Sequence, residues 1–174
     1  MANNNTAYMA PRAASLADPT SATTFKKYSD STKAAIVYFP VLPTGVTNAK
    51  FYFRAAGRAS TIGSHNVTPK VSYGTSATAG SNTVIAASTA RAVATTTAAW
   101  MIEGELYWDS VSLTLKGNFT AENGSTAALD AFAATTTKTA VDLTTSGNGL
   151  TVECTIATGG GDIGYLDELS LEAL

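Results

Sequence analysis

Two glutamates have the spacing that glycoside hydrolysis requires of a carboxylate pair. Glu103 and Glu105 lie two residues apart in the run WMIEGELYWDSVSLTL, residues 100–115. In a β-strand, residues two apart point to the same face and lie about 7 Å from each other, a separation compatible with such a pair. Every alternating strand with two acids has this spacing, however, and no apolar pocket wall is evident that would raise the pKa of one carboxyl. A solvated sheet face is therefore the favoured interpretation of the pair.

The other candidates for nucleophilic catalysis are single residues. The only histidine, His65, lies in a polar run of Gly, Ser and Asn, which predicts an exposed loop, and no nucleophile-elbow motif accompanies it. The only cysteine, Cys154, occupies an apolar position of an alternating run, which predicts a buried, inert thiol. One cysteine also excludes an intramolecular disulfide and a cysteine-based zinc cluster. We therefore predict no enzymatic activity and no catalytic residue.

Ligands for a metal or a phosphate group are equally sparse. Asp162, Asp167 and Glu168 lie near the last predicted strand, but their spacing does not match the EF-hand loop. The glycines at 159–161 are not followed by the Lys-Ser or Lys-Thr of a phosphate-binding loop. We predict no metal and no cofactor, with a structural calcium ion at the acidic residues as the alternative.

The charge pattern argues against nucleic acid and membrane as partners. The 174 residues include 11 Lys and Arg and 13 Asp and Glu, for a net charge of −2. The basic residues are scattered, with Lys26-Lys27 as the one adjacent pair, whereas nucleic-acid binders concentrate basic charge in a patch. No run approaches the roughly 20 apolar residues of a membrane span, and the first residues lack the apolar segment of a signal peptide. We expect the protein to be made in a cytoplasm and not to leave it by the standard secretion route.

Composition and residue alternation together predict an all-β chain. Charged residues make up 14% of the sequence, below the typical quarter, and Thr, Ala, Ser and Gly replace them. In residues 100–108 the alternation places Trp100 and Trp108 on an apolar, core-facing side of a strand. Glu103, Glu105 and Tyr107 fall on the opposite side, which we expect to face solvent or a neighbouring subunit.

About eight or nine short strands follow from the same pattern. Beyond 100–108, strands are predicted at 34–39, 50–57, 70–73, 111–119, 139–144, 149–156 and 164–174, with one or two weak strands and a possible helical turn at 83–94. The inward-facing positions are Phe51, Phe53, Ala55, Val71, Tyr73, Val111, Leu113, Leu115, Leu150, Val152, Cys154, Ile156, Leu169 and Leu171. Residues 127–134 form the one helical candidate, with a loop packed by Phe132 as the alternative. This set predicts an antiparallel β-sandwich of jelly-roll type.

The first 32 residues differ from the rest in lacking any period. We predict that residues 1–32 are an extended N-terminal arm and that residues 33–174 are the β-sandwich domain. Tyr8, Met9 and Leu16 are isolated apolar anchors among small residues, a pattern that suits an extended peptide lying on a neighbouring subunit. A flexible terminus is the alternative.

Exposed aromatic residues raise a second functional class. Tyr52, Tyr107 and Tyr165 are candidates for stacking on sugar rings. The run Tyr165-Leu-Asp-Glu-Leu-Ser-Leu171 is also similar to the last strand of carbohydrate-binding jelly rolls. This similarity implies a carbohydrate-binding module or a fibre-type receptor-binding domain as the alternative function.

The runs FYFRAAGRAS, VSYGTS, NTVIAAS, AAWMIEGELYWDS and GNFTAENG, within residues 50–125, resemble small head decoration (cement) proteins of tailed bacteriophages. The resemblance implies a non-enzymatic jelly roll on the capsid exterior of a virion, synthesised in the bacterial host cytoplasm. It also implies a homo-oligomer, a trimer in preference to a dimer, that binds the major capsid protein across neighbouring subunits and reaches neighbours with terminal arms. The predicted partner-binding residues are Tyr8, Met9, Leu16, Glu103, Glu105 and Tyr107.

Overall fold

The computed structural model describes residues 24–27, 35–60, 65–76, 81–87, 91–93, 98–123, 129–156 and 163–174. These residues form eleven β-strands and, within the described ranges, no helix. The strands are β1 (Thr24–Lys27), β2 (Ala35–Tyr38), β3 (Asn48–Ser60), β4 (His65–Gly74), β5 (Thr83–Ala87), β6 (Arg91–Val93), β7 (Ala98–Asp109), β8 (Thr114–Asn123), β9 (Leu129–Lys138), β10 (Gly149–Ile156) and β11 (Ile163–Ala173).

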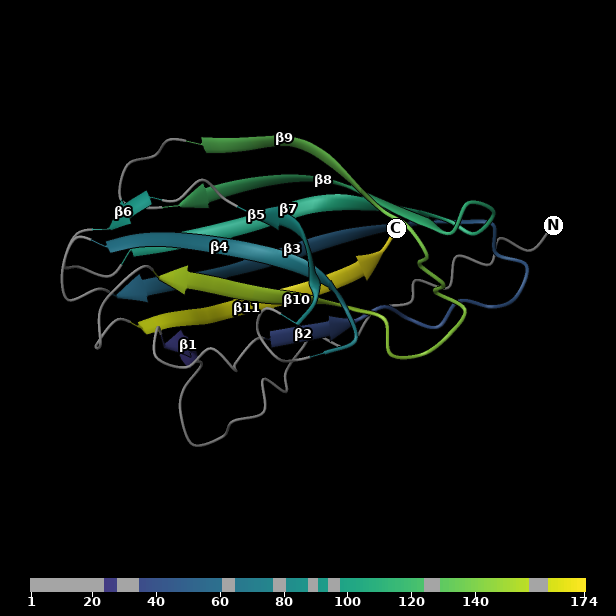
Figure 1. The fold of residues 1–174 in the computed structure, drawn as a ribbon, viewed down its shortest axis with the longest axis horizontal. Coiled ribbons are helices and arrows are strands. Elements are labelled where there is room, and N and C mark those ends of the chain that lie inside the picture. The colour runs from purple at the N-terminus through teal and green to yellow at the C-terminus, as the bar shows by residue number, and fades with distance from the viewer. Residues whose placement is uncertain are drawn as a thin grey trace.

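The strands build two antiparallel sheets that pack face to face as a β-sandwich (Figure 1). The six-stranded sheet has the order β1-β11-β3-β7-β8-β9. The five-stranded sheet has the order β2-β10-β4-β5, and β6 pairs with β4 beside β5. The predicted antiparallel β-sandwich is therefore confirmed, while the finer jelly-roll assignment stays a prediction.

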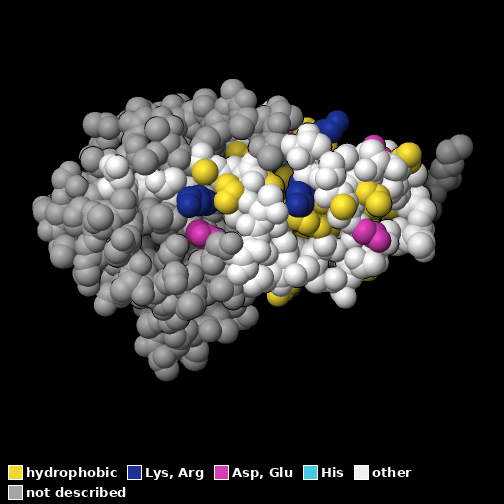
Figure 2. All heavy atoms as spheres, viewed as in Figure 1, with side chains coloured by type: hydrophobic (Ala, Val, Ile, Leu, Met, Phe, Trp, Pro, Cys, Tyr) yellow, Lys and Arg dark blue, Asp and Glu magenta, His cyan; other side chains and the backbone are white. Residues whose placement is uncertain are grey.

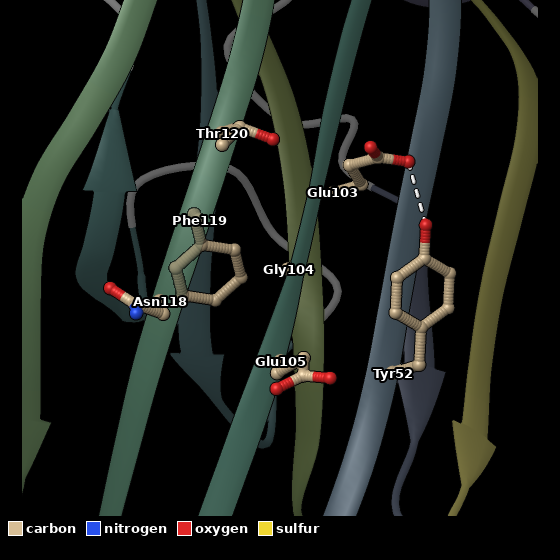
Figure 3. A pocket seen from close by; sticks show the side chains of 7 residues that line it. All are labelled: Tyr52, Glu103, Gly104, Glu105, Asn118, Phe119 and Thr120. Carbon is tan, nitrogen blue, oxygen red and sulfur yellow. Dashed lines mark hydrogen bonds between the residues drawn. The ribbon is translucent and has the colours of Figure 1, made fainter.

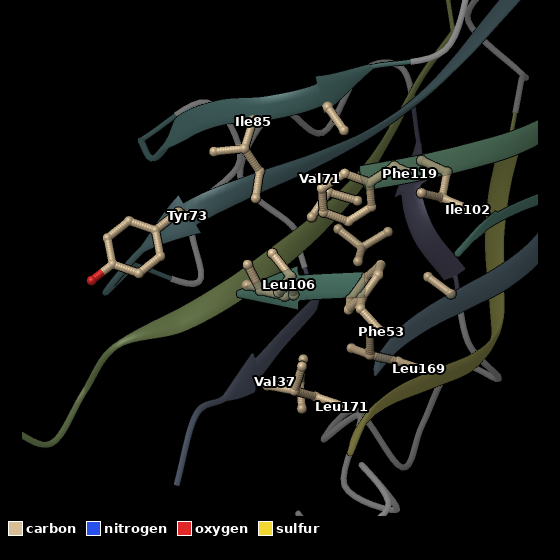
Figure 4. Packing of buried hydrophobic residues seen from close by; sticks show 14 of the residues in the cluster. Val37, Phe53, Val71, Tyr73, Ile85, Ile102, Leu106, Phe119, Leu169 and Leu171 are labelled. Atoms are coloured by element: carbon tan, nitrogen blue, oxygen red, sulfur yellow. The ribbon is translucent and has the colours of Figure 1, made fainter. Parts of the chain in front are cut away.

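The core lies between the two sheets and is built from alternate residues of each strand. Phe53 on β3 and Phe119 on β8 meet edge to face, with ring centroids 6.2 Å apart. In Figure 4, Val71 and Ile85 from the five-stranded sheet point toward Leu106 and the two phenylalanines of the six-stranded sheet. The described side chains predicted to face inward and found buried are Phe51, Phe53, Ala55, Val71, Tyr73, Leu115, Leu150, Val152, Leu169 and Leu171. The side chains of Cys154 and Ile156 lie outside the described residues.

Both tryptophans of the chain belong to this core, as predicted. Trp100 and Trp108 are 2% and 1% exposed. The indole nitrogen of Trp108 donates a hydrogen bond of 2.8 Å to the backbone oxygen of Val141. The same strand that exposes the glutamates is therefore anchored through its other face.

The polar break after Trp108 is the turn of the β7–β8 hairpin. Asp109 accepts a 2.9 Å hydrogen bond from the backbone nitrogen of Val111, which closes the turn. The inward prediction for Val111 and Leu113 is wrong, because both lie in this turn, outside the ladder, and are 85% and 40% exposed. Leu113 also takes a φ of 49°, which a regular strand cannot accommodate. Leu115 is the first buried residue of β8.

The predicted helix at 127–134 is wrong, since its described residues belong to β9. Strand β9 pairs with β8 from Leu115↔Lys138 to Glu122↔Leu129. The spacing of Leu129 and Phe132 suggested a helical period, and alanine, which fills much of this segment, is the strongest helix former. Ladder hydrogen bonds to a long neighbouring strand override such a local preference.

The predicted strand at 139–144 is also wrong. Residues 139–142 carry no strand pairing, and residues 143–144 form a turn between β9 and β10. Val141 and Leu143 are nevertheless fully buried. Their alternation therefore reflected a loop that packs on the core rather than a strand.

The N-terminal region contains a strand that the sequence pattern did not indicate. Strand β1 pairs antiparallel with β11, with Thr24 opposite Tyr165 and Lys27 opposite Ile163. The remaining residues of the predicted arm, including the anchors Tyr8, Met9 and Leu16, lie outside the described residues. The boundary between arm and domain therefore stays a prediction.

The loop prediction for His65 is wrong for its backbone. His65 begins β4, opposite Val93 of β6, because β4 is longer than the predicted 70–73 segment and pairs with three strands. The weak strands expected at 83–94 are present as β5 and β6, and their described residues contain no helical turn.

The central strand β10 is buried on both of its faces. Thr151 and Glu153 point to the face opposite Leu150 and Val152, yet they are only 0% and 4% exposed. Asn82 donates a 3.1 Å hydrogen bond to the Thr151 hydroxyl, which satisfies part of this polar layer.

Candidate functional site

The outer face of the six-stranded sheet carries the described residues that the sequence predicts to bind a partner. Glu103, Glu105 and Tyr107 project from β7 on the side opposite the buried Ile102 and Leu106, as the alternation predicts. Side chains from three neighbouring strands complete this face. They are Lys50, Tyr52, Arg54 and Arg58 of β3, Asn118 and Thr120 of β8, and Asp167 and Glu168 of β11.

Glu105 contacts two groups that stabilise its ionised form. Lys50 Nζ lies 2.8 Å from Glu105 Oε1, and the Tyr107 hydroxyl donates a 2.6 Å hydrogen bond to Oε2. The Lys50 ammonium also lies 5.3 Å from the centroid of the Tyr107 ring, directly across the strand pair. The hydrogen bond to Lys50 is the main reason that the pKa of Glu105 lies below its ordinary value, and the same bond raises the pKa of Lys50.

Glu103 has its own donors, one strand pair further along. The Tyr52 hydroxyl donates a 2.6 Å hydrogen bond to Glu103 Oε2, and this bond, together with burial, raises the pKa of Tyr52. Arg54 Nη1 lies 3.9 Å from the same oxygen. The other end of the guanidinium, Nε, lies 3.2 Å from Glu168 Oε2 as an ion pair without hydrogen-bond geometry. The two glutamates therefore lie on one face, but each has a separate set of partners.

Glu105 does not suit the role of general acid in the chemistry that the spacing suggests. A general acid in glycoside hydrolysis needs a carboxyl with a raised pKa. Lys50 and Tyr107 act in the opposite direction on Glu105. Glu105 is therefore expected to stay ionised at neutral pH.

Two acidic residues of β11, Asp167 and Glu168, contact arginines. Asp167 forms two hydrogen bonds of 2.8 Å with the Arg58 guanidinium. A β-bulge between Leu166 and Glu168 turns Asp167 and Glu168 both outward. In the described part of the chain, no three His, Cys, Asp or Glu side chains gather as metal ligands, and Asp162 lies outside that part.

A shallow hollow opens on the outer face above β7, and we call it the Gly104 hollow. Its volume is about 300 Å³, and it is lined by Tyr52, Glu103, Gly104, Glu105, Asn118, Phe119 and Thr120 (Figure 3). The cross-strand pairs Glu103↔Thr120 and Glu105↔Asn118 border it on either side of the Gly104↔Phe119 pair. Sequence reasoning missed Asn118 and Thr120, although the alternation of β8 around the buried Phe119 already places both on the outer face.

Among the aromatic candidates for sugar stacking, the structure places two. Tyr107 is 46% exposed, and Tyr52 is partly buried at the edge of the Gly104 hollow. The side chain of Tyr165 lies outside the described residues.

The described residues contain no helix long and apolar enough to cross a membrane.

One end of the sandwich exposes apolar side chains, two of which, Val111 and Leu113, the sequence pattern placed inside. The turn of the β7–β8 hairpin is tied to two other connections, through Ser110 N to Thr47 O and Val141 N to Leu113 O, both 2.9 Å. Val41, Val111 and Leu113 are the exposed large hydrophobic residues of these connections. Figure 2 shows hydrophobic side chains at this end, on the right.

Comparison with known proteins adds no identification: no family model, no curated protein and no solved structure matches the chain. A β-sandwich hosts many unrelated functions, so the fold does not fix one. The function is therefore argued from the surfaces themselves.

Proposed function

We propose that the protein is a non-enzymatic structural protein of a tailed-bacteriophage virion. It decorates the capsid exterior and stabilises the capsid by binding across neighbouring subunits of the major capsid protein. The observation that carries this proposal is the outer face of the six-stranded sheet, where Glu103 and Glu105 are neutralised by fixed partners on β3 and β7. Such a face offers an ordered polar surface in place of a reactive group.

Preorganisation is what makes this face suited to a partner. Long charged side chains lose rotamer entropy when an interface immobilises them. Here Lys50, Glu105 and Tyr107 already restrain each other in the free protein, so less entropy is lost on binding. Opposite charges at known positions also favour one orientation of a complementary partner.

The remaining parts of the proposal concern assembly. The protein is a homo-oligomer, a trimer, whose N-terminal arms reach neighbouring subunits through Tyr8, Met9 and Leu16. The protein is synthesised in the bacterial cytoplasm, and its final location is the virion. A single mass measurement by analytical ultracentrifugation distinguishes the trimer from a dimer or a monomer.

The test uses phage capsids assembled without the protein, to which the purified full chain is added. Sedimentation with the capsids and a rise in their thermal disruption temperature are expected. The double variant Glu105→Ala/Tyr107→Ala should weaken co-sedimentation by about tenfold, since charge pairs and aromatic anchors dominate such interfaces. Ser81→Ala, on an exposed loop of the five-stranded sheet, is the matched control and should bind normally.

Two results would contradict the capsid role. One is the absence of co-sedimentation at any protein concentration tested. The other is equal heat resistance of capsids with and without the protein. Normal binding by the double variant would move the contact away from the outer face of the six-stranded sheet.

The alternative function was a carbohydrate-binding module or a fibre-type receptor-binding domain. Burial removes Trp100 and Trp108 as surfaces on which sugars could stack. Glycan-array binding by a protein that does not co-sediment with capsids would favour this alternative over the capsid role.

A further inference from the structure

We propose that the Gly104 hollow is a binding site for one ring of a neutral carbohydrate. This inference goes beyond the capsid role and does not depend on it. The hollow combines an aromatic side chain, a floor formed at a glycine, and a rim of polar groups that have capacity for further hydrogen bonds.

The polar rim supplies both donors and acceptors. Asn118 and Thr120 are exposed, and within the described residues neither side chain has a hydrogen-bond partner. Glu103 uses Oε2 for Tyr52 and Arg54, so Oε1 remains available as an acceptor. An amide, a hydroxyl and a carboxylate oxygen around one hollow match the alternating donors and acceptors of sugar hydroxyl groups.

Tyr52 provides the apolar contact of the site. Figure 3 shows its ring lying along β3, with its hydroxyl directed to Glu103. This 2.6 Å hydrogen bond fixes the orientation of the ring before a ligand binds. A fixed aromatic ring beside a polar rim can contact the C–H face of a sugar while the rim binds its hydroxyls.

The charges around the hollow favour a neutral ligand over a lysine or arginine side chain of a protein partner. A cation gains most from a carboxylate without a counter-ion. Glu105 already pairs with Lys50 at 2.8 Å, and Glu103 lies 3.9 Å from Arg54. A further cation would therefore meet one positive charge already beside each of the two acids.

The size of the hollow limits the ligand to a short one. Its volume of about 300 Å³ is at the lower end of the range for ligand pockets, about 300–1,000 Å³. We therefore expect one ring in the hollow and weak affinity, with a Kd of about 1 mM.

The test is a titration of the ¹⁵N-labelled full chain, followed by NMR, with glucose, galactose, mannose, N-acetylglucosamine and N-acetylgalactosamine. At least one sugar should give saturable shifts centred on the amides of residues 103–105 and 118–120. Asn118→Ala and Thr120→Ala should each lower the affinity for that sugar by about three- to tenfold, the loss expected for one hydrogen bond. Lys116→Ala and Glu122→Ala, exposed on the same face of β8 but outside the hollow, should bind with wild-type affinity.

Three results would overturn the site. The first is that no sugar of the panel saturates, and the second is that shifts centre elsewhere on the chain. The third is that Asn118→Ala and Thr120→Ala bind like the wild type while their spectra show an intact fold. Saturable binding of Nα-acetyl-lysine methylamide, which keeps its charged ε-ammonium group, without sugar binding would assign the hollow to a cationic partner instead. Because capsid co-sedimentation is measured separately, loss of the sugar site leaves the capsid role untouched.

Discussion

At the scale of single residues, the outer face of the six-stranded sheet is defined by the side chains that contact each carboxylate. Glu105 has Lys50 and Tyr107, Glu103 has Tyr52 and Arg54, and each carboxylate has a donor within 2.8 Å. These contacts join neighbouring strands, so they depend on the register of β3 and β7. Titration of one carboxyl therefore reports on the pairing of β3 and β7 at that position.

The pKa of Glu105 should lie below its ordinary value in the folded protein, because Lys50 and Tyr107 stabilise its ionised form. Lys50→Met should raise this pKa, whereas Lys116→Met should leave it nearly unchanged. Since the folded pKa is the depressed one, the stabilisation by this pair is present above the unfolded pKa. It is lost as pH falls through the folded pKa. An NMR titration of the carboxyl carbon checks both values, and an unshifted Glu105 would contradict the contact.

Gly104 is required by the close approach of β7 and β8. A Cβ at this position would collide with the backbone oxygen of Asn118 and lie 2.8 Å from Phe119 Cδ1. We expect Gly104→Ala to lower the free energy of unfolding by about 1–3 kcal/mol, the cost of overpacking a filled site. Urea denaturation measures this loss. Thr120→Ala, exposed on the facing strand, should change stability by less than about 0.5 kcal/mol, and equal effects of the two variants would refute the steric argument.

At the scale of elements, β7 is the strand that connects surface and core. One of its faces presents the glutamates, while the other buries Trp100 and Trp108. Through the indole of Trp108 it also fixes the connection between β9 and β10 at Val141. The position of the outer face is therefore set by contacts on the buried face of the same strand.

Trp108→Phe should destabilise the protein by about 2–4 kcal/mol. The substitution leaves the buried oxygen of Val141 without its donor and leaves a cavity beside the smaller ring. Tyr107→Phe, the neighbouring position on the exposed face, removes a hydrogen bond of similar length but should cost less than about 1 kcal/mol. Chemical denaturation of both variants gives the comparison, and a similar loss for the two would show that burial does not decide the cost.

At the scale of the whole molecule, both sheets join distant parts of the chain. Strand β1 pairs with β11, β2 with β10, and β3 with β11 (Figure 1). The N-terminal and C-terminal regions must therefore meet before either sheet is complete. The Gly104 hollow and the outer face of the six-stranded sheet form on β3, β7 and β8 only when these distant strands are paired.

This connectivity predicts slow folding. Proteins dominated by non-local strand pairs fold in milliseconds to seconds, because loop-closure entropy is lost before the contacts form. Stopped-flow dilution from urea, followed by the fluorescence of the two buried tryptophans, should show a main phase in this range. A dominant microsecond phase would contradict the importance of the distant pairings.

The sequence by itself determined the features that follow from alternation. These include the all-β class, the buried tryptophans, the inward phenylalanines of β3 and the outward glutamates of β7. Each is decided by which face of a strand a residue occupies, and a period of two reveals this without knowledge of the neighbours. The low content of charged residues pointed in the same direction.

Only the tertiary structure decided what depends on strand pairing and register. Residues 129–134 form a strand because they pair with β8. Val141 and Leu143 are buried although they lie in a loop, because that loop packs on the core. The Gly104 hollow and the partners of Glu103 and Glu105 likewise depend on which residue lies opposite on the next strand. Local preference cannot determine this, since pairing brings together residues far apart in the chain whose contacts outweigh local propensity.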